Sequence, residues 1–77
     1  MEDLKLYIME TCPYCQKVGN FLKEKGIEVP ILDINKDAKY KEELKKIGGK
    51  VQVPMLSIDG KPLYESDDII EWFKKNR

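Results

Sequence analysis

The dipeptide Asp59-Gly60 separates two short apolar stretches, residues 51–58 (VQVPMLSI) and 61–64 (KPLY). Asp-Gly is a strong signal for a two-residue hairpin turn, and such a turn joins antiparallel strands. A parallel pair would instead need a crossover connection of about a dozen residues or more. The last two strands of the chain are therefore predicted to be antiparallel neighbours.

The first part of the chain shows a different kind of connection. We predict strands over residues 4–9 (LKLYIM) and 28–34 (EVPILDI), with a helix between them that begins at Pro13 and stops at Gly26. Proline suits the first position of a helix, and glycine supplies a left-handed stop. Pro30 is tolerable near the start of an edge strand. A strand, helix, strand unit makes a parallel pair through a right-handed crossover.

Caps and apolar spacing predict two further helices. Asn35 or Asp37 can cap a helix that ends at Gly48-Gly49. Its apolar side chains recur at i, i+4 and i+7, namely Tyr40, Leu44 and Ile47. The last helix has Ser66 as its predicted N-cap, with acids in the first turn and cations at the end: Asp67, Asp68, Lys74, Lys75 and Arg77. The order βαβ then ββα predicts an α/β fold with a mixed four-stranded sheet flanked by three helices.

Length and composition limit the classes of function. A chain of 77 residues has room for one core, so we expect residues 1–77 to form a single domain. Fourteen basic and fourteen acidic side chains are interspersed, which predicts no nucleic-acid surface. No window approaches the roughly 18 apolar residues of a membrane span, and the acidic start does not suit a secretory signal. We expect a monomer in the cytoplasm, without a membrane partner.

Both cysteines of the chain, Cys12 and Cys15, stand at the predicted beginning of the first helix. A cytosolic chain keeps its thiols reduced, so a CxxC pair there favours redox or metal chemistry. Helix N-termini stabilise anions, and thiolates at such positions have pKa values of roughly 3.5–7.5. Cys12 is the predicted nucleophile, and Cys15, one turn further on, is predicted to attack second. Pro13 fixes the turn, and Tyr14 can lay its ring beside an incoming thiol compound.

The cysteine pair has three other possible roles. A structural disulfide would close a very short loop and restrain the unfolded chain weakly. A zinc site normally needs four ligands, or three and a water, and the chain has no histidine and no third cysteine. We therefore predict no metal site within one chain, while a site shared between two chains stays open. Inert buried thiols are the remaining alternative, and a helix start beside proline argues against it.

The segment CPYC, after a strand that ends in ETC, resembles the active-site signature of the dithiol glutaredoxins. The element order is also that of their thioredoxin-like fold, and the resemblance covers essentially the whole chain. It implies that Cys12 and Cys15 are catalytic. It further implies that their neighbours Thr11, Pro13 and Tyr14 contact the substrate.

Two more segments resemble glutathione-binding parts of that family. Gln52-Val53-Pro54 stands where glutaredoxins carry threonine-valine-proline, with a cis valine-proline bond and a valine backbone that pairs with the cysteinyl unit of glutathione. Residues 63–69 resemble the γ-glutamyl site at the start of the last helix, which assigns binding roles to Glu65, Ser66 and Asp67. Simpler roles stay open: a surface aromatic for Tyr14, core packing for Val53, capping for Ser66 and dipole compensation for the acids.

The chain departs from the family pattern at two places. Met9 stands where many glutaredoxins have a lysine that pairs with the glycine carboxylate of glutathione, and Lys46 or Lys50 could substitute. Tyr64 and Glu65 replace two glycines before the γ-glutamyl site. The Glu65-Ser66 pair instead resembles the glutathione-binding turn of glutathione transferases. A transferase needs a helical second domain, for which 77 residues leave no room.

The resemblance implies a thiol-disulfide oxidoreductase that reduces glutathione mixed disulfides or protein disulfides. It needs no bound cofactor and uses glutathione as its reducing co-substrate. One alternative is a thioredoxin-like protein disulfide reductant recharged by a flavoprotein such as thioredoxin reductase, which Met9 and the missing glycines favour. Another is a non-enzymatic role, in which the CxxC pairs of two subunits hold a metal or an iron–sulfur cluster.

Overall fold

A computed structural model describes residues 3–76 of the chain. Seven elements follow one another: β1 (Leu4–Ile8), α1 (Pro13–Lys25), β2 (Ile31–Asp33), α2 (Ala38–Gly48), β3 (Met55–Ile58), β4 (Lys61–Tyr64) and α3 (Ser66–Asn76). The strands form one sheet in the order β2-β1-β3-β4. β1 and β2 are parallel, whereas β1 with β3 and β3 with β4 are antiparallel. The predicted mixed four-stranded sheet with three helices is confirmed.

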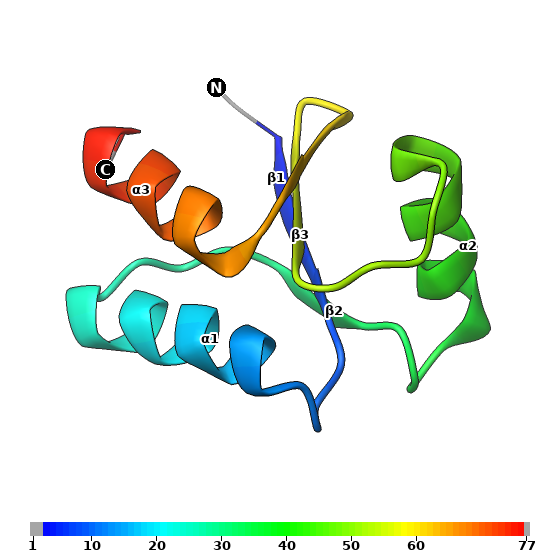
Figure 1. Cartoon of the computed structure of the whole chain (residues 1–77), viewed down its shortest axis with the longest axis horizontal. Coiled ribbons are helices and arrows are strands. Elements are labelled where there is room, and N and C mark those ends of the chain that lie inside the picture. The colour runs from blue at the N-terminus through cyan, green and yellow to red at the C-terminus, as the bar shows by residue number, and fades with distance from the viewer. Residues whose placement is uncertain (1–2, 77) are drawn as a thin grey trace.

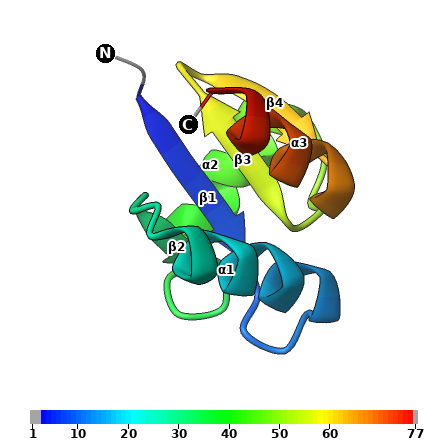
Figure 2. The same cartoon turned by 90° about the vertical axis from the view of Figure 1, so that its left-hand side faces the viewer.

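The sheet lies between two helical layers (Figure 1). α1 and α3 pack side by side on one face, and α2 covers the other face alone. Figure 2 shows α1 crossing the carboxyl end of β1, so this helix begins near the end of a central strand. Each helix of the described chain is too short or too polar to cross a membrane.

The two faces of the sheet carry separate apolar cores. Beneath α1 and α3 lies a cluster made by Leu4, Leu6, Val18, Leu22, Leu56, Ile69 and Phe73. Beneath α2 lies a second cluster made by Tyr7, Ile34, Leu44 and Met55, against which the predicted apolar positions Tyr40 and Ile47 also pack. Alternate side chains of β1 therefore point to opposite faces of the sheet, as the two-residue repeat of a strand requires.

The observed strands are shorter than the predicted ones. β1 ends at Ile8, β2 spans only Ile31–Asp33, and β3 begins at Met55. Proline explains both shortened starts, because it has no N–H to donate to a ladder. Pro30 precedes β2, where its carbonyl accepts a hydrogen bond from the Leu6 N–H at 2.9 Å. Pro54 precedes β3 and follows a cis peptide bond with Val53, as the resemblance implied.

The helix caps agree with prediction in part. Asp37, rather than Asn35, caps α2, and its side chain accepts a hydrogen bond from the Lys39 N–H at 2.9 Å. Gly26 ends α1 in the left-handed conformation, as predicted. The Asp59-Gly60 turn also has the expected positive φ angles, 53° and 84°.

The predicted N-cap of the last helix is wrong by one residue. Ser66 is already the first residue of α3, and the Glu65 carbonyl accepts the first helical hydrogen bond from the Ile69 N–H at 3.0 Å. Glu65 is the single residue between β4 and α3, and its φ of 70° turns the chain sharply from the strand into the helix. The predicted role of Arg77 at the end of this helix lies outside the described residues.

Candidate active site

The loop between β1 and α1 places Cys12 at the N-terminus of the helix. Its backbone N–H donates to the Met9 carbonyl at 3.0 Å, which closes a turn after β1. Cys12 then adopts extended backbone angles as the N-cap, with Pro13 at the start of the helix. Its carbonyl accepts the first helical bond from the Gln16 N–H at 3.0 Å. The turn thus presents Cys12 to the free N–H groups of the first helical turn.

The two cysteines occupy different environments. The Cys12 sulfur accepts a hydrogen bond from the Cys15 backbone N–H at 3.4 Å, so Cys12 caps the helix through its thiol. Cys12 is half-buried, whereas Cys15 is only 3% exposed. Both thiols are free. A disulfide that approaches from solvent therefore meets Cys12 before Cys15.

Burial also determines the acid–base behaviour of Cys15. Desolvation raises the pKa of the Cys15 thiol most, and nearby Cys12 and Asp33 add to it, while a backbone contribution from Met9 acts in the opposite direction; together they bring the pKa to about 12. The thiolate is the reactive form of cysteine. At neutral pH Cys15 is therefore held as a thiol.

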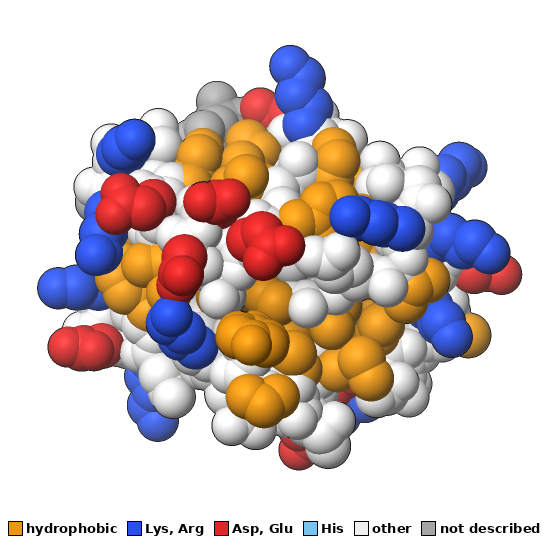
Figure 3. Space-filling view, in the orientation of Figure 1, with side chains coloured by type: hydrophobic (Ala, Val, Ile, Leu, Met, Phe, Trp, Pro, Cys, Tyr) orange, Lys and Arg blue, Asp and Glu red, His pale blue; other side chains and the backbone are white. Residues whose placement is uncertain are grey.

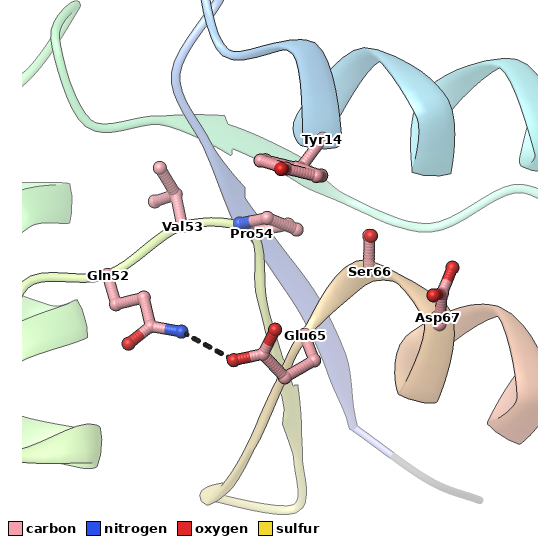
Figure 4. A pocket seen from close by; sticks show the side chains of 7 residues that line it. All are labelled: Tyr14, Gln52, Val53, Pro54, Glu65, Ser66 and Asp67. Atoms are coloured by element: carbon pink, nitrogen blue, oxygen red, sulfur yellow. Dashed lines mark hydrogen bonds between the residues drawn. The ribbon is translucent and has the colours of Figure 1, made fainter.

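A pocket of about 330 Å³ opens beside the beginning of α1. Its lining brings together seven of the residues assigned to binding: Tyr14, Gln52, Val53, Pro54, Glu65, Ser66 and Asp67. Figure 4 shows the Tyr14 ring on one side, the Val53-Pro54 loop in the middle and the start of α3 opposite. The other assigned neighbours, Thr11 and Pro13, are exposed and lie outside this lining.

A hydrogen bond ties two walls of the pocket together. The Gln52 side-chain amide donates to the Glu65 carboxylate at 3.2 Å (Figure 4). Gln52 precedes the Val53-Pro54 loop, and Glu65 is the left-handed residue before α3. The contact links two segments that the sequence separates by 13 positions.

An ion pair joins the two helices that flank the pocket. The Lys17 ammonium on α1 lies 2.6 Å from the Asp67 carboxylate on α3. Both side chains are largely exposed, at 55% and 80%, so the pair contributes little to stability. Figure 3 shows apolar side chains gathered in the middle of this face, with acidic ones alongside them. The pair neutralises one of the two acids in the pocket lining.

Known proteins resemble the chain over most of its length. Residues 6–77 match the family model described as glutathione S-transferase, N-terminal domain. Glutaredoxin 3 of Escherichia coli K12 is 35% identical over 69 residues, which make up 90% of this chain and 83% of that protein. The chain belongs to the glutaredoxin family.

Solved structures agree with this assignment. A glutaredoxin from Archaeoglobus fulgidus has a TM-score of 0.75 and 26% identity, with 96% of this chain and 88% of that chain covered. Glutathione transferase Omega 3C from Trametes versicolor has a TM-score of 0.82 and 35% identity, with 96% of this chain but only 33% of that chain covered. The thioredoxin-like fold is confirmed, and the chain is a glutaredoxin-like thiol oxidoreductase.

Tyr64, the last residue of β4, places its side chain against α2 at Gly48. Its hydroxyl is buried against Gly48, where a Cβ atom would overlap it, and has no hydrogen-bond partner among the described residues. Burial raises the pKa of Tyr64. The Lys50 ammonium lies 4.6 Å from the centre of the ring, in cation–π range. A role for Lys50 or Lys46 in carboxylate binding stays a prediction.

Sequence reasoning missed two residues of this region. Lys17 follows the cysteine pair on an exposed helix face, and nothing local indicates a partner 50 positions away. Asp33 is a buried carboxylate in an otherwise apolar strand, at 9% exposure. An acid inside the apolar run ILDI was the available signal, because buried carboxylates are rare.

Proposed function

We propose that this chain reduces glutathione mixed disulfides and protein disulfides in the cytoplasm, as a monomeric single domain with glutathione as its reducing co-substrate. The observation that carries the proposal is the Cys12 thiol, which caps α1 and accepts the Cys15 N–H at 3.4 Å. The pocket that could receive the partner is lined by Tyr14, two residues after Cys12 in the chain. No bound cofactor is needed for thiol–disulfide exchange.

The reaction begins at Cys12. Its thiolate attacks one sulfur of a mixed disulfide, a Cys12–sulfur bond forms, and the other thiol leaves. In the monothiol route a glutathione thiolate then attacks the mixed disulfide, which restores Cys12 and releases glutathione disulfide. In the dithiol route Cys15 attacks the Cys12 sulfur, closes the Cys12–Cys15 bridge and expels the partner as a thiol. The buried Cys15 thiol favours the monothiol route at neutral pH.

The pocket offers partners for both ends of glutathione. The Val53 backbone is available at the cis-proline loop for the cysteinyl unit, as in the family. The beginning of α3 supplies free N–H groups for the γ-glutamyl carboxylate, and Asp67 can pair with its ammonium. The Tyr14 ring, 64% exposed, forms an apolar wall beside the approaching disulfide.

Steady-state reduction of a small glutathione mixed disulfide tests the proposal. Parent protein, Cys15→Ser and Cys12→Ser are compared with glutathione, glutathione reductase and its nicotinamide substrate. Parent and Cys15→Ser should turn over, and Cys12→Ser should be inactive. A Cys12→Ser variant with parental activity would remove the assignment of the nucleophile.

A thioredoxin-like reductant recharged by a flavoprotein is the second candidate. Two observations favour it: Lys17 already pairs with Asp67, and the charged residues of the pocket lining, Glu65 and Asp67, are both acids. Glutathione carries a net negative charge, which such a pocket does not attract. Insulin reduction with thioredoxin reductase and its nicotinamide substrate, measured without glutathione, separates the two candidates. Turnover there, with glutathione inert, would decide for the second.

A further inference from the structure

Asp33 is a buried carboxylate to which the exchange reaction above assigns no role. It is the last residue of β2 and is 9% exposed. One of its oxygens accepts a hydrogen bond from the Asn35 N–H at 2.8 Å. That bond stabilises the turn after the strand, and a neutral asparagine could make it equally well. The charge of the side chain is therefore not explained by the turn.

The alternation of the strand places this carboxylate on the same face of the sheet as the cysteines. Leu32 and Ile34, on either side of Asp33, both pack in the cluster beneath α2. Successive side chains of a strand point to opposite faces, so Asp33 points toward α1. Its register partner Ile8 packs in the cluster beneath α1 and α3, which supports the same direction.

Asp33 also lies close in space to the loop that carries the cysteines. The Ile34 N–H donates to the Ile8 carbonyl at 2.9 Å, which holds the end of β2 beside the end of β1. The next residue, Met9, accepts the Cys12 N–H at 3.0 Å, and the Cys12 sulfur in turn accepts the Cys15 N–H at 3.4 Å. Asp33 and Cys15 thus approach the end of β1 from neighbouring elements on one face of the sheet.

We propose that Asp33 is a positioning residue whose negative charge holds Cys15 in its protonated form, so that Cys15 attacks slowly once Cys12 carries a partner. The inference rests on the proposed roles of the two cysteines. It predicts that Asp33 lengthens the life of the mixed disulfide on Cys12. While the mixed disulfide on Cys12 persists, a second thiol from solution can attack it before Cys15 does.

The electrostatics around Cys15 agree with this role. Asp33 is among the groups that raise the pKa of Cys15, together with burial and Cys12. The Lys17–Asp67 pair contains one charge of each sign, on the exposed side of α1. Tyr7 and its partner Glu43 belong to the opposite face, beneath α2. Asp33 is the carboxylate whose charge acts on Cys15.

The affected step is the intramolecular exchange. The Cys15 thiol loses a proton to solvent, its sulfur attacks the Cys12 sulfur, and the bond between Cys12 and the partner breaks. The partner leaves as a thiolate and takes up a proton. A Cys12–Cys15 disulfide forms, and the partner is reduced by the same two electrons. The step needs the ionised form of Cys15, so a nearby negative charge slows it.

The decisive variant is Asp33→Asn, which retains an oxygen for the Asn35 N–H and removes the charge. Asp37→Asn is the matched control, because Asp37 likewise accepts a backbone N–H two residues ahead but is exposed at the cap of α2. Reduced protein is mixed with dithiobis-nitrobenzoate, a chromogenic aromatic disulfide, and thiolate release is followed by absorbance. The first phase reports attack by Cys12 and the second reports attack by Cys15.

The second phase should be roughly two- to fivefold faster in Asp33→Asn than in the parent, because a gain in ionised Cys15 is offset in part by its lower nucleophilicity. Asp37→Asn should match the parent. In a Cys12→Ser background, alkylation of Cys15 should rise at a lower pH when Asp33 is changed to asparagine. A second phase that is unchanged or slower, or an unshifted alkylation profile, would overturn the role of Asp33.

Failure of the underlying function would look different. If Cys12→Ser released the first equivalent of thiolate as fast as the parent, the nucleophile itself would be misassigned. If the parent showed no second phase, Cys15 would not resolve the mixed disulfide, and the proposed role of Asp33 would be wrong. Inactivity with glutathione alone would leave the aromatic disulfide assay, and its result for Asp33, intact.

Discussion

The Cys12 sulfur accepts a hydrogen bond from the Cys15 backbone N–H at 3.4 Å, while the Cys15 sulfur lies buried behind it. We predict that one equivalent of iodoacetamide labels Cys12 alone at pH 7. The pKa of Cys15 is raised to about 12, so its labelling should increase only at strongly alkaline pH. Peptide mapping of the alkylated protein checks this. Equal labelling of both cysteines at pH 7 would contradict the structure.

Stability should fall at alkaline pH, because buried groups, Cys15 and Tyr7 among them, prefer their neutral forms. Burial raises the pKa of Cys15 from 9.0 to about 12. Burial and the hydrogen bond to Glu43 raise that of Tyr7 from 10.0 to about 12. Both folded values exceed the unfolded ones, so this stability is fully present below about pH 9 and is lost as the pH rises toward 12.

Denaturant unfolding at pH 8 and pH 11 measures the loss. Tyr7→Phe should cost about 1 kcal/mol at pH 8 through its lost hydrogen bond, yet lose less stability than the parent between the two pH values. Tyr14→Phe is the control, because the Tyr14 ring is exposed, and it should follow the parent. If Tyr7→Phe lost as much stability as the parent between pH 8 and pH 11, the raised pKa assigned to Tyr7 would be wrong.

The contact between Tyr64 and Gly48 predicts opposite effects at the two positions. Tyr64→Phe should stabilise the protein by about 1 kcal/mol, because it removes a buried hydroxyl that has no partner among the described residues. Gly48→Ala should destabilise it by more than about 2 kcal/mol, since the new Cβ would overlap the Tyr64 side chain. Gly19→Ala, a helical position with open space, should instead be stabilising by about 0.5–1 kcal/mol.

A double-mutant cycle separates the overlap from other effects of the alanine. In a Tyr64→Leu background, Gly48→Ala should cost clearly less than in the parent, because the aromatic ring is gone. Thermal unfolding of the four proteins gives the coupling. An equal cost of Gly48→Ala in both backgrounds would show that the ring does not require a glycine there.

The ion pair between Lys17 and Asp67 should affect affinity more than stability. Lys17→Gln should change the free energy of unfolding by less than about 0.5 kcal/mol. It should lower the KM for glutathione by roughly two- to threefold, because Asp67 becomes free to pair with the γ-glutamyl ammonium. Lys23→Gln, an exposed lysine later on the same helix, should leave KM unchanged. A higher KM in Lys17→Gln would show that the lysine attracts glutathione instead.

Much of the fold could be predicted because its signals are local. The Asp59-Gly60 turn, the proline at the start of α1 and the glycine after it each specify a backbone geometry on their own. The two-residue turn and the long crossover then determine which strands are parallel. Strand ends were less predictable, because Pro30 and Pro54 remove ladder donors at positions that apolar composition alone assigns to strands.

The candidate site could be predicted where residues are neighbours in the sequence. Cys12 and Cys15 share one helical turn, and Glu65, Ser66 and Asp67 share one turn of the chain. Contacts between distant segments could not be predicted. Lys17 meets Asp67 and Gln52 meets Glu65 only because the sheet brings α1, α3 and the proline loop together. The side-chain direction of Asp33 likewise depends on the strand register, which the sequence does not specify.

We expect Cys12 to form a mixed disulfide with glutathione in this pocket. Reduced Cys15→Ser protein, which cannot close the intramolecular bridge, is incubated with glutathione disulfide and analysed by intact mass and peptide mapping. We predict one glutathione per chain, attached to Cys12 and released by excess glutathione. A protein that stays unmodified, although the same Cys12 reacts with an aromatic disulfide, would contradict the claim and leave protein disulfides as its substrates.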